Sequence, residues 1–267
     1  MQNNLPQTIE EYRDQRWRRA PDLRVETAVD AENLIEDVGF CGALTDARTN
    51  SPSIYIAVCG RRDAFMPKNV QKDPEASFAW ITKDELMRRG RVYYAKLLKG
   101  RSTFVASRLV PHFNALFGLP RKNEKDVLSD EARRILKVLR SEWEMASKDL
   151  REESGVSDRK QFNKALDELQ KTMKVIPSEV LYEPFFTYIW ALAEGRFAKE
   201  LATKVKREDA LREIARAHLQ SAGMTLRGEL AKITGLSRSD AGKGNHLLVD
   251  EGFAERVGVG VYRLVDF

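Results

Sequence analysis

Between residues 129 and 180 the sequence predicts a helix, a short helix, a glycine turn, a third helix and a strand, in that order. Ser129 is a good N-cap, and a short second helix over residues 147–154 ends before Gly155. In the third helix, the inward face is formed by Phe162, Ala165, Leu166 and Leu169. Residues 174–180 can then form a strand. This order is typical of a helix-turn-helix followed by a wing.

The same order returns at the end of the chain. A helix over residues 208–222 is followed by a second helix over 226–234, which Thr225 is expected to cap. Gly235 supplies the turn and Ser237 opens the next helix, while residues 253–265 read as a β-hairpin. We therefore predict tandem winged helix-turn-helix modules in a mainly α chain with small β wings, an α+β fold.

The first half of the chain follows this order less clearly. Apolar residues recur at helical spacing over residues 28–38, and Gly39 stands where a C-cap glycine is expected. Thr82 and Glu85 form a capping box that predicts a helix running to Gly100. The buried face of that helix would consist of Leu86, Tyr93, Tyr94, Leu97 and Leu98.

A chain of 267 residues with 42% hydrophobic residues is long and apolar enough for several compact units. We expect an N-terminal helical arm over residues 1–26 and a basic, winged-helix-like domain over 27–125. A central winged helix over 126–200 and a C-terminal winged helix over 201–267 would complete the chain.

Positive charge is concentrated in one region. The net charge is +5, but residues 61–125 hold 15 Lys and Arg against 6 Asp and Glu, so the remainder of the chain is net negative. A cationic surface attracts a polyanion through counterion release, which favours double-stranded DNA as the partner. A solvated basic face is the alternative interpretation.

The residues expected to contact DNA fall into two sets. The first, in the basic region, is Arg61, Arg62, Arg88, Arg89, Arg91, Lys96, Lys99 and Arg101. The second, at the openings of two helices, is Arg159, Lys160, Gln161, Asn163, Lys164, Arg238, Lys243 and Asn245. Phosphate contacts would position the protein, and Arg, Asn or Gln could read base edges if these helices enter the major groove.

Several other classes of protein are not indicated. Cys41 and Cys59 lie in apolar stretches without a CxxC pair, and the three histidines are far apart, so we expect no disulfide, no metal and no cofactor. A charged N-terminus and the lack of a long apolar run predict a cytoplasmic, nucleoid-associated protein, with a monomer favoured. The aromatic segment 182–195 is expected to be a packing element rather than a platform for base stacking.

Segments that resemble a known family cover most of the chain after residue 27. They are VGF at 38–40, PSIYIAVCGRR at 52–62, RVYYAKLLKGRSTFVA at 91–106, SDEARRIL at 129–136, FNKALDELQ at 162–170 and the block 209–235. Through them the chain resembles bacterial winged-helix proteins of the AlkZ and YcaQ type, which are alkylation- and crosslink-repair DNA glycosylases. It is most similar to the AlkZ-related branch. The resemblance implies tandem winged helices around a concave face that holds DNA.

The catalytic motif of those glycosylases is missing. Where they carry glutamine-x-glutamine or glutamine-x-aspartate after a V-G-hydrophobic segment, this chain has Cys41, Gly42, Ala43 and Leu44. Hydrolysis of an N-glycosidic bond needs a polar group that positions water, and none of these side chains supplies one. Asp46 is a candidate substitute, or the cap of a turn. Because the sequence ends after the last predicted wing, we expect the C-terminal barrel of the glycosylases to be absent.

Three hypotheses follow. The first is a non-catalytic tandem winged-helix protein that binds DNA and recognises damage. The second is a DNA glycosylase with a non-standard active site, which would extrude the damaged base. The third is a winged-helix protein-interaction module or transcriptional regulator. An interaction module with no nucleic-acid role would bind DNA weakly and almost independently of salt.

Overall fold

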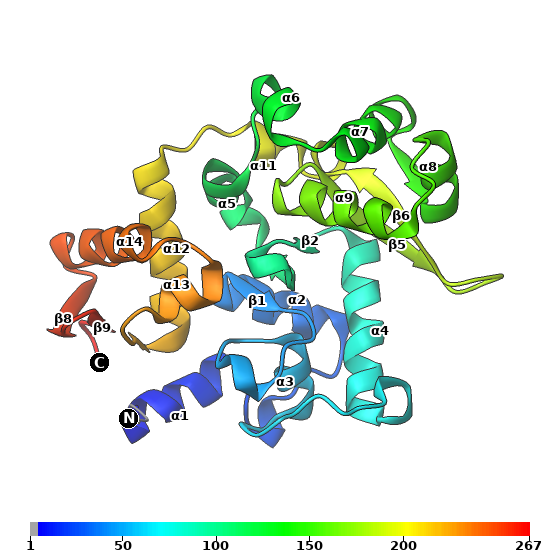
Figure 1. Ribbon diagram of the computed structural model, residues 1–267. Helices are drawn as coiled ribbons and strands as arrows, with labels where there is room; N and C mark the ends of the chain where they lie inside the picture. The colour runs from blue at the N-terminus through cyan, green and yellow to red at the C-terminus, as the bar shows by residue number, and fades with distance from the viewer. Residues whose placement is uncertain (1–4) are drawn as a thin grey trace.

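The computed structural model describes residues 5–267, and in this part of the chain the strands form three small antiparallel sheets (Figure 1). Their strands are β1 (Phe40–Gly42), β2 (Tyr93–Lys96) and β3 (Ser102–Val105); β4 (Glu144–Ala146), β5 (Val175–Leu181) and β6 (Thr187–Leu192); and β7 (Met224–Thr225), β8 (Ala254–Gly258) and β9 (Val261–Leu264). In every sheet the last strand lies in the middle, so the orders are β1-β3-β2, β4-β6-β5 and β7-β9-β8.

Each sheet belongs to a unit with the same order of elements: helix, strand, helix, helix, strand, strand. The helices are α2 (Ala28–Val38), α3 (Ile54–Cys59) and α4 (Pro74–Arg89) in the first unit, α7 (Asp130–Glu142), α8 (Ser147–Glu153) and α9 (Arg159–Lys171) in the second, and α12 (Arg207–Ala222), α13 (Glu229–Thr234) and α14 (Arg238–Asp250) in the third. The predicted fold class, mainly helical with small antiparallel sheets, is confirmed.

The remaining helices precede or join the units and are α1 (Gln7–Arg16), α5 (Val110–Phe117), α6 (Glu124–Val127), α10 (Ala193–Arg196) and α11 (Ala198–Ala202). The 3₁₀ turns Ala47–Thr49, Val70–Lys72 and Leu98–Gly100 lie within the first unit, and those at Pro21–Leu23, Ser107–Leu109 and Arg121–Asn123 lie outside the units. Helix α5 packs against both α11 and α12, so it connects the first unit to the third.

Buried side chains form three apolar clusters. One lies within residues 119–192 and includes Ile135, Leu166 and Trp190. Another contains Phe40 from β1 together with Leu248 from α14, and Phe113 of α5 packs edge-on against Phe40 at 5.5 Å between ring centroids. The first and third units therefore share an apolar core.

The local signals for helix ends are confirmed at several places. Ser129 accepts a hydrogen bond from the backbone N–H of Ala132, and Ser237 does the same for Asp240, so both serine caps are in place. Gly39 follows α2 with φ +81°, which suits a glycine.

The helix predicted from Thr82 to Gly100 is wrong at both ends. Helix α4 begins at Pro74, because Asp73 caps it through the backbone N–H of Ala76 and a proline is compatible with the first helical position. Thr82 is buried in the middle of the helix. Gly90, at φ +63°, ends α4, and the tyrosines that follow belong to strand β2.

Two further expectations differ from the structure. Thr225 lies in β7 and caps nothing, because the carboxylate of Glu229 accepts the hydrogen bond from Leu226 N–H instead. In the segment 182–195, Trp190 and Leu192 are packed as predicted, but the tip of the β5–β6 hairpin exposes its aromatic side chains to solvent, Phe185 by 81%.

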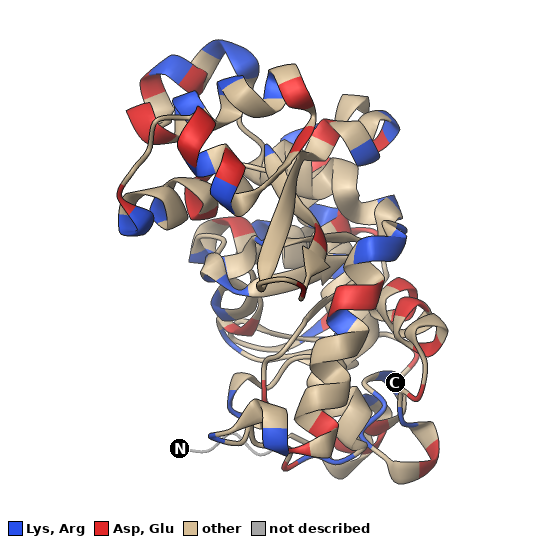
Figure 2. Cartoon of the chain, turned by 90° about the vertical axis from the view of Figure 1, so that its right-hand side faces the viewer, with Lys and Arg blue, Asp and Glu red and all other residues tan. Residues whose placement is uncertain are grey.

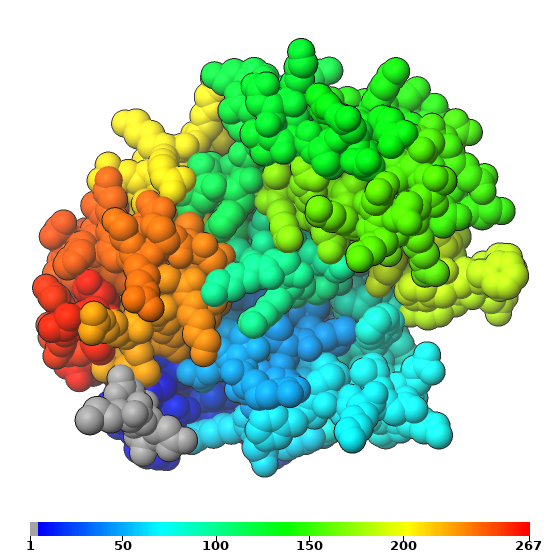
Figure 3. Space-filling model, in the orientation of Figure 1, coloured from blue at the N-terminus to red at the C-terminus, as the bar shows by residue number. Residues whose placement is uncertain are grey.

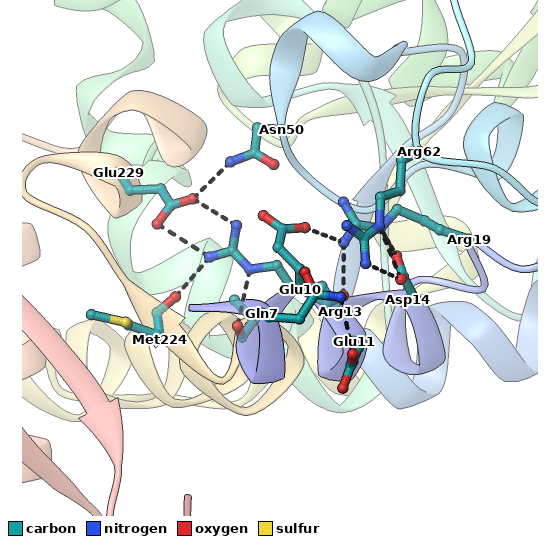
Figure 4. Close-up of polar contacts among 11 residues, drawn as sticks. Gln7, Glu10, Glu11, Arg13, Asp14, Arg19, Asn50, Arg62, Met224 and Glu229 are labelled. Carbon is teal, nitrogen blue, oxygen red and sulfur yellow. Dashed lines mark hydrogen bonds and ion pairs between the residues drawn. The ribbon is translucent and has the colours of Figure 1, made fainter. Parts of the chain in front are cut away.

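Helix α1 is fastened to the third unit by a buried arginine (Figure 4). Arg13 is fully buried, and its guanidinium donates to the carbonyl oxygens of Ala222 at 3.0 Å and Met224 at 2.7 Å. Its Nη1 lies 3.3 Å from Oε1 of Glu229, which also accepts from Asn50 Nδ2 of the first unit. The N-terminal helix is thus part of the folded body; residues 1–4 of the predicted arm lie outside the described residues.

We predict that Arg13→Met lowers the free energy of unfolding by roughly 3 kcal/mol, because Glu229 loses its guanidinium partner and the carbonyl groups of Ala222 and Met224 lose this donor. Thermal denaturation followed by circular dichroism measures this. Arg24→Met is the control, since Arg24 forms only a solvent-exposed ion pair at 3.8 Å and should change stability by less than about 1 kcal/mol. An Arg13→Met protein that melts with the wild type would contradict the structural role.

Candidate nucleic-acid interface

Six of the eight cationic residues predicted in the basic region are held in ion pairs. The pairs are Arg61 with Glu75, Arg62 with Asp14, Arg88 with Glu179, Arg89 and Arg91 with Glu32, and Lys96 with Asp167. Three of them join separate parts of the fold, because Asp14 lies in α1, Glu179 in β5 and Asp167 in α9. The predicted basic region is therefore largely neutralised by carboxylates from other elements.

The side of the molecule turned toward the viewer in Figure 2 reflects this pairing. Basic and acidic residues are interspersed along the helices on this side. An exposed ion pair contributes little stability, but it places a negative charge beside each cation and so weakens its attraction for a polyanion. The expectation that these six residues contact DNA stays a prediction.

Lys99 and Arg101 differ from the other six. Both are exposed, and neither has a carboxylate within ion-pair distance among residues 5–267. They lie in the turn between β2 and β3, which contacts α9 on one side and α13 on the other. Figure 3 shows this central segment between the second unit, in green, and the third unit, in orange.

Glycines let the turn approach both units closely. A side chain on Gly235, which ends α13, would come within 3.2 Å of Cγ of Lys99. A side chain on Gly100 would come within 3.2 Å of Cε of Lys171, the last residue of α9. Lys171 is exposed and also lacks an ion pair among the described residues, so Lys99, Arg101 and Lys171 gather at the centre of this face.

The opening of α9 presents polar side chains to solvent, as predicted. Asp158 caps the helix through Gln161 N–H at 2.7 Å, and Phe162 points into the core. The exposed residues are Arg159, Lys160, Gln161, Asn163 and Lys164. In the part of the chain that the structure describes, none of these cations is paired with a carboxylate, so α9 keeps its positive charge.

The three residues predicted in α14 have different surroundings. Arg238 is exposed and unpaired within residues 5–267, in the first turn of the helix. Lys243 lies 3.3 Å from Glu208, whose carboxylate offsets its charge. Asn245 is buried, with 6% of its surface exposed.

The segment that replaces the glycosylase motif lines only a small cavity. Its volume is about 30 Å³, far below the several hundred Å³ typical of small-molecule sites. Among the described residues that line it there is no carboxylate, amide or histidine. A side chain at Gly42 would collide with the side chain of Thr45, so a glutamine at that position requires Thr45 to shift. The thiol of Cys41 is fully buried, and burial raises its pKa.

Asp46 has a structural role. It caps the turn Ala47–Thr49, accepts hydrogen bonds from the N–H groups of Arg48 and Met66, and pairs with the Arg48 guanidinium. The hydrogen bond from Arg48 holds the pKa of the Asp46 carboxyl below its usual value. A general base works best with a pKa near the working pH, so the Asx-cap interpretation is favoured over a catalytic one.

Sequence reasoning missed two cations, Lys171 and Arg227. Lys171 ends α9, away from the opening that a recognition helix is expected to present, and Arg227 stands in a loop before α13.

No group of side chains among residues 5–267 has the arrangement of a metal site, and no helix there is long and apolar enough to cross a membrane.

Comparison with known proteins places this geometry in a family. A search of the solved structures matches Streptomyces sahachiroi DNA glycosylase AlkZ over 97% of this chain and 69% of that chain, at 12% identity and a TM-score of 0.58. At that identity the match shows a shared fold. A search of curated proteins finds no match. The model of the AlkZ-related family matches residues 25–234, which is most of the chain. The chain therefore belongs to the AlkZ-related family.

Proposed function

We propose that this protein binds double-stranded DNA through the face centred on the β2–β3 turn, and that it does not hydrolyse glycosidic bonds by the route of the AlkZ glycosylases. The three units are proposed to be winged helices, since each has the order helix, strand, helix, helix, strand, strand with the last strand central in its sheet. The predicted domain limits at residues 27, 126 and 201 belong to this proposal.

The distribution of unpaired cations carries the proposal. Lys99, Arg101 and Lys171 meet where the first unit contacts the other two, and none has a carboxylate partner in the described structure. The exposed residues of α9 continue this charge along the second unit. Cations that are free of internal partners release counterions when they meet phosphates, which is the main source of affinity for duplex DNA.

Base reading is proposed for the helices and not for the central turn. Arg159, Gln161 and Asn163 lie exposed near the start of α9, and Arg238 lies exposed at the start of α14. Arg suits guanine, and Asn or Gln suits adenine, if these helices enter a major groove. Because Asn245 is buried and Lys243 is paired, both are proposed to contribute less than Arg238.

The cavity beside β1 supports a non-catalytic role. Its described lining offers hydroxyl groups and Arg101 but no carboxylate or imidazole to act as a general base, and its volume admits water but not a nucleobase. Asp46 is committed to Arg48 and to two backbone N–H groups. A role in recognising damaged DNA would then depend on binding alone.

Protein interaction is a second candidate function, favoured by one observation. The tip of the β5–β6 hairpin exposes Tyr182, Phe185 and Phe186, and with Trp80 and Ile81 of α4 it forms an apolar pocket of about 520 Å³. Exposed apolar groups that lie together are typical of surfaces that bind another macromolecule.

We predict that binding to a fluorescein-labelled 20-base-pair duplex falls by orders of magnitude between about 50 and 200 mM salt, because several phosphates are neutralised. Fluorescence anisotropy at five salt concentrations measures the slope. Weak binding that hardly changes with salt would favour the protein-interaction candidate instead.

For the same duplex, the slope of log K against log salt concentration should be smaller by about 2 in the double variant Lys99→Ala and Arg101→Ala. Each lost cation removes about one unit of slope, because one phosphate is no longer neutralised. The matched control is Lys137→Ala with Lys148→Ala, which removes the same charge from exposed residues of α7 and α8. Equal slopes for the two double variants would contradict an interface at the β2–β3 turn.

We also predict no base excision. A labelled duplex with one N-alkylated purine, incubated with excess protein and then treated with alkali, should show no more strand cleavage than the same duplex without protein. Cleavage above that background at the modified base would identify a glycosylase with a non-standard active site.

A further inference from the structure

A pocket of about 560 Å³ lies in the third unit between α13, α14 and the β8–β9 turn. Two arginines, Arg227 and Arg238, line it together with Asn245, and the described residues of its lining include no aspartate or glutamate. The volume falls in the range of pockets that hold small molecules or parts of larger ones. The pocket lies outside the site at the β2–β3 turn, and it shares Arg238 and Asn245 with the proposed contacts of α14.

Asn245 leaves part of its amide without a partner. The residue is 94% buried, lies in the pocket wall, and its Oδ1 accepts no hydrogen bond in the described structure. Buried polar atoms are nearly always hydrogen-bonded in folded proteins, so this acceptor oxygen calls for a donor that the described residues do not supply.

Gly242 leaves the pocket open, although a glycine at this position lowers the stability of helix α14. A glycine inside a helix is less favourable than an alanine, and it is usually explained by close packing. Gly244 has that explanation, because a side chain there would come within 2.6 Å of the carbonyl oxygen of Leu211 in α12. A side chain on Gly242 would meet nothing within 4 Å, so packing does not require this glycine.

Arg227 is held over the pocket by the wing. A side chain on Gly260, which has φ +72°, would come within 3.0 Å of Cγ of Arg227, so the arginine stem lies across the β8–β9 turn. Neither Arg227 nor Arg238 has an ion-pair partner among residues 5–267. The two unpaired guanidinium groups form a set of donors that suits a phosphate group, whereas the unpaired Oδ1 of Asn245 is an acceptor.

We propose that this pocket binds the phosphate of a nucleotide, either in the backbone of a DNA duplex or in a free mononucleotide. Arg227 and Arg238 would bind the phosphate oxygens, so Arg238 would contact a phosphate in place of a base edge. The Oδ1 of Asn245 would accept a hydrogen bond from a donor on the attached nucleoside. The duplex form of the proposal rests on the proposed DNA binding, whereas the mononucleotide form stands apart from it.

The test compares Arg227→Ala and Gly242→Leu with the control Lys148→Ala. Arg227→Ala removes one donor, and Gly242→Leu fills the pocket while favouring the helix. The probes are the 20-base-pair duplex, followed by fluorescence anisotropy, and deoxyadenosine 5′-monophosphate, followed by isothermal titration calorimetry. We expect both pocket variants to bind at least one probe about tenfold more weakly than wild type, with the control unchanged for that probe.

Each outcome separates the two sources of phosphate. If the variants lose affinity only for the duplex, the pocket binds a backbone phosphate. If they lose affinity only for the mononucleotide, the pocket binds a free ligand, and this holds even if wild type binds no duplex and the proposed function fails. The proposal is overturned if both variants, shown by circular dichroism to be folded, bind each probe as wild type does, or if wild type binds neither. Retained, salt-dependent duplex binding in the variants would leave the proposed function intact.

Discussion

The close approach of the β2–β3 turn to the other two units is the contact on which the functional face depends. The turn adopts left-handed backbone at Lys99 (φ +53°) and Gly100 (φ +69°), and such a conformation costs a residue other than glycine about 1 kcal/mol. Gly235 and Gly100 provide the space that lets Lys99 and Lys171 lie against backbone. The first and second units thereby bring unpaired cations to one place, beside the end of α13 in the third unit.

Charge in this protein divides into two populations with different physical roles. Arg62, Arg88 and Lys96 reach carboxylates on other elements, and Arg13 is buried against Glu229 and two carbonyl groups, so these side chains connect the parts of the fold. Cations at the β2–β3 turn and along α9 have no such partners in the described chain. Net charge along the sequence therefore says less about a polyanion surface than the presence or absence of a nearby carboxylate.

Sequence reasoning recovered the features that depend on local signals. The caps Ser129 and Ser237, the glycine after α2 and the helical spacing of the second unit all act within a few residues. The prediction of a helix over residues 91–98 was wrong because a short apolar run fits a strand as well as a helix. Pairing of this segment with β3 makes it a strand. The six ion pairs of the basic region could not be assigned from sequence, because most of the partners are brought close only by folding. Lys99 and Arg101 were identified, but what distinguishes them from their neighbours is the lack of a carboxylate beside them.

The most direct test of the central claim is lysine acetylation footprinting with and without saturating duplex DNA, read by mass spectrometry. All the lysines compared are exposed in the free protein. The account predicts that DNA protects Lys99, Lys171 and the α9 residues Lys160 and Lys164, while Lys137 and Lys148 react as before. Protection of Lys137 and Lys148 with unchanged reaction at Lys99 and Lys171 would contradict it.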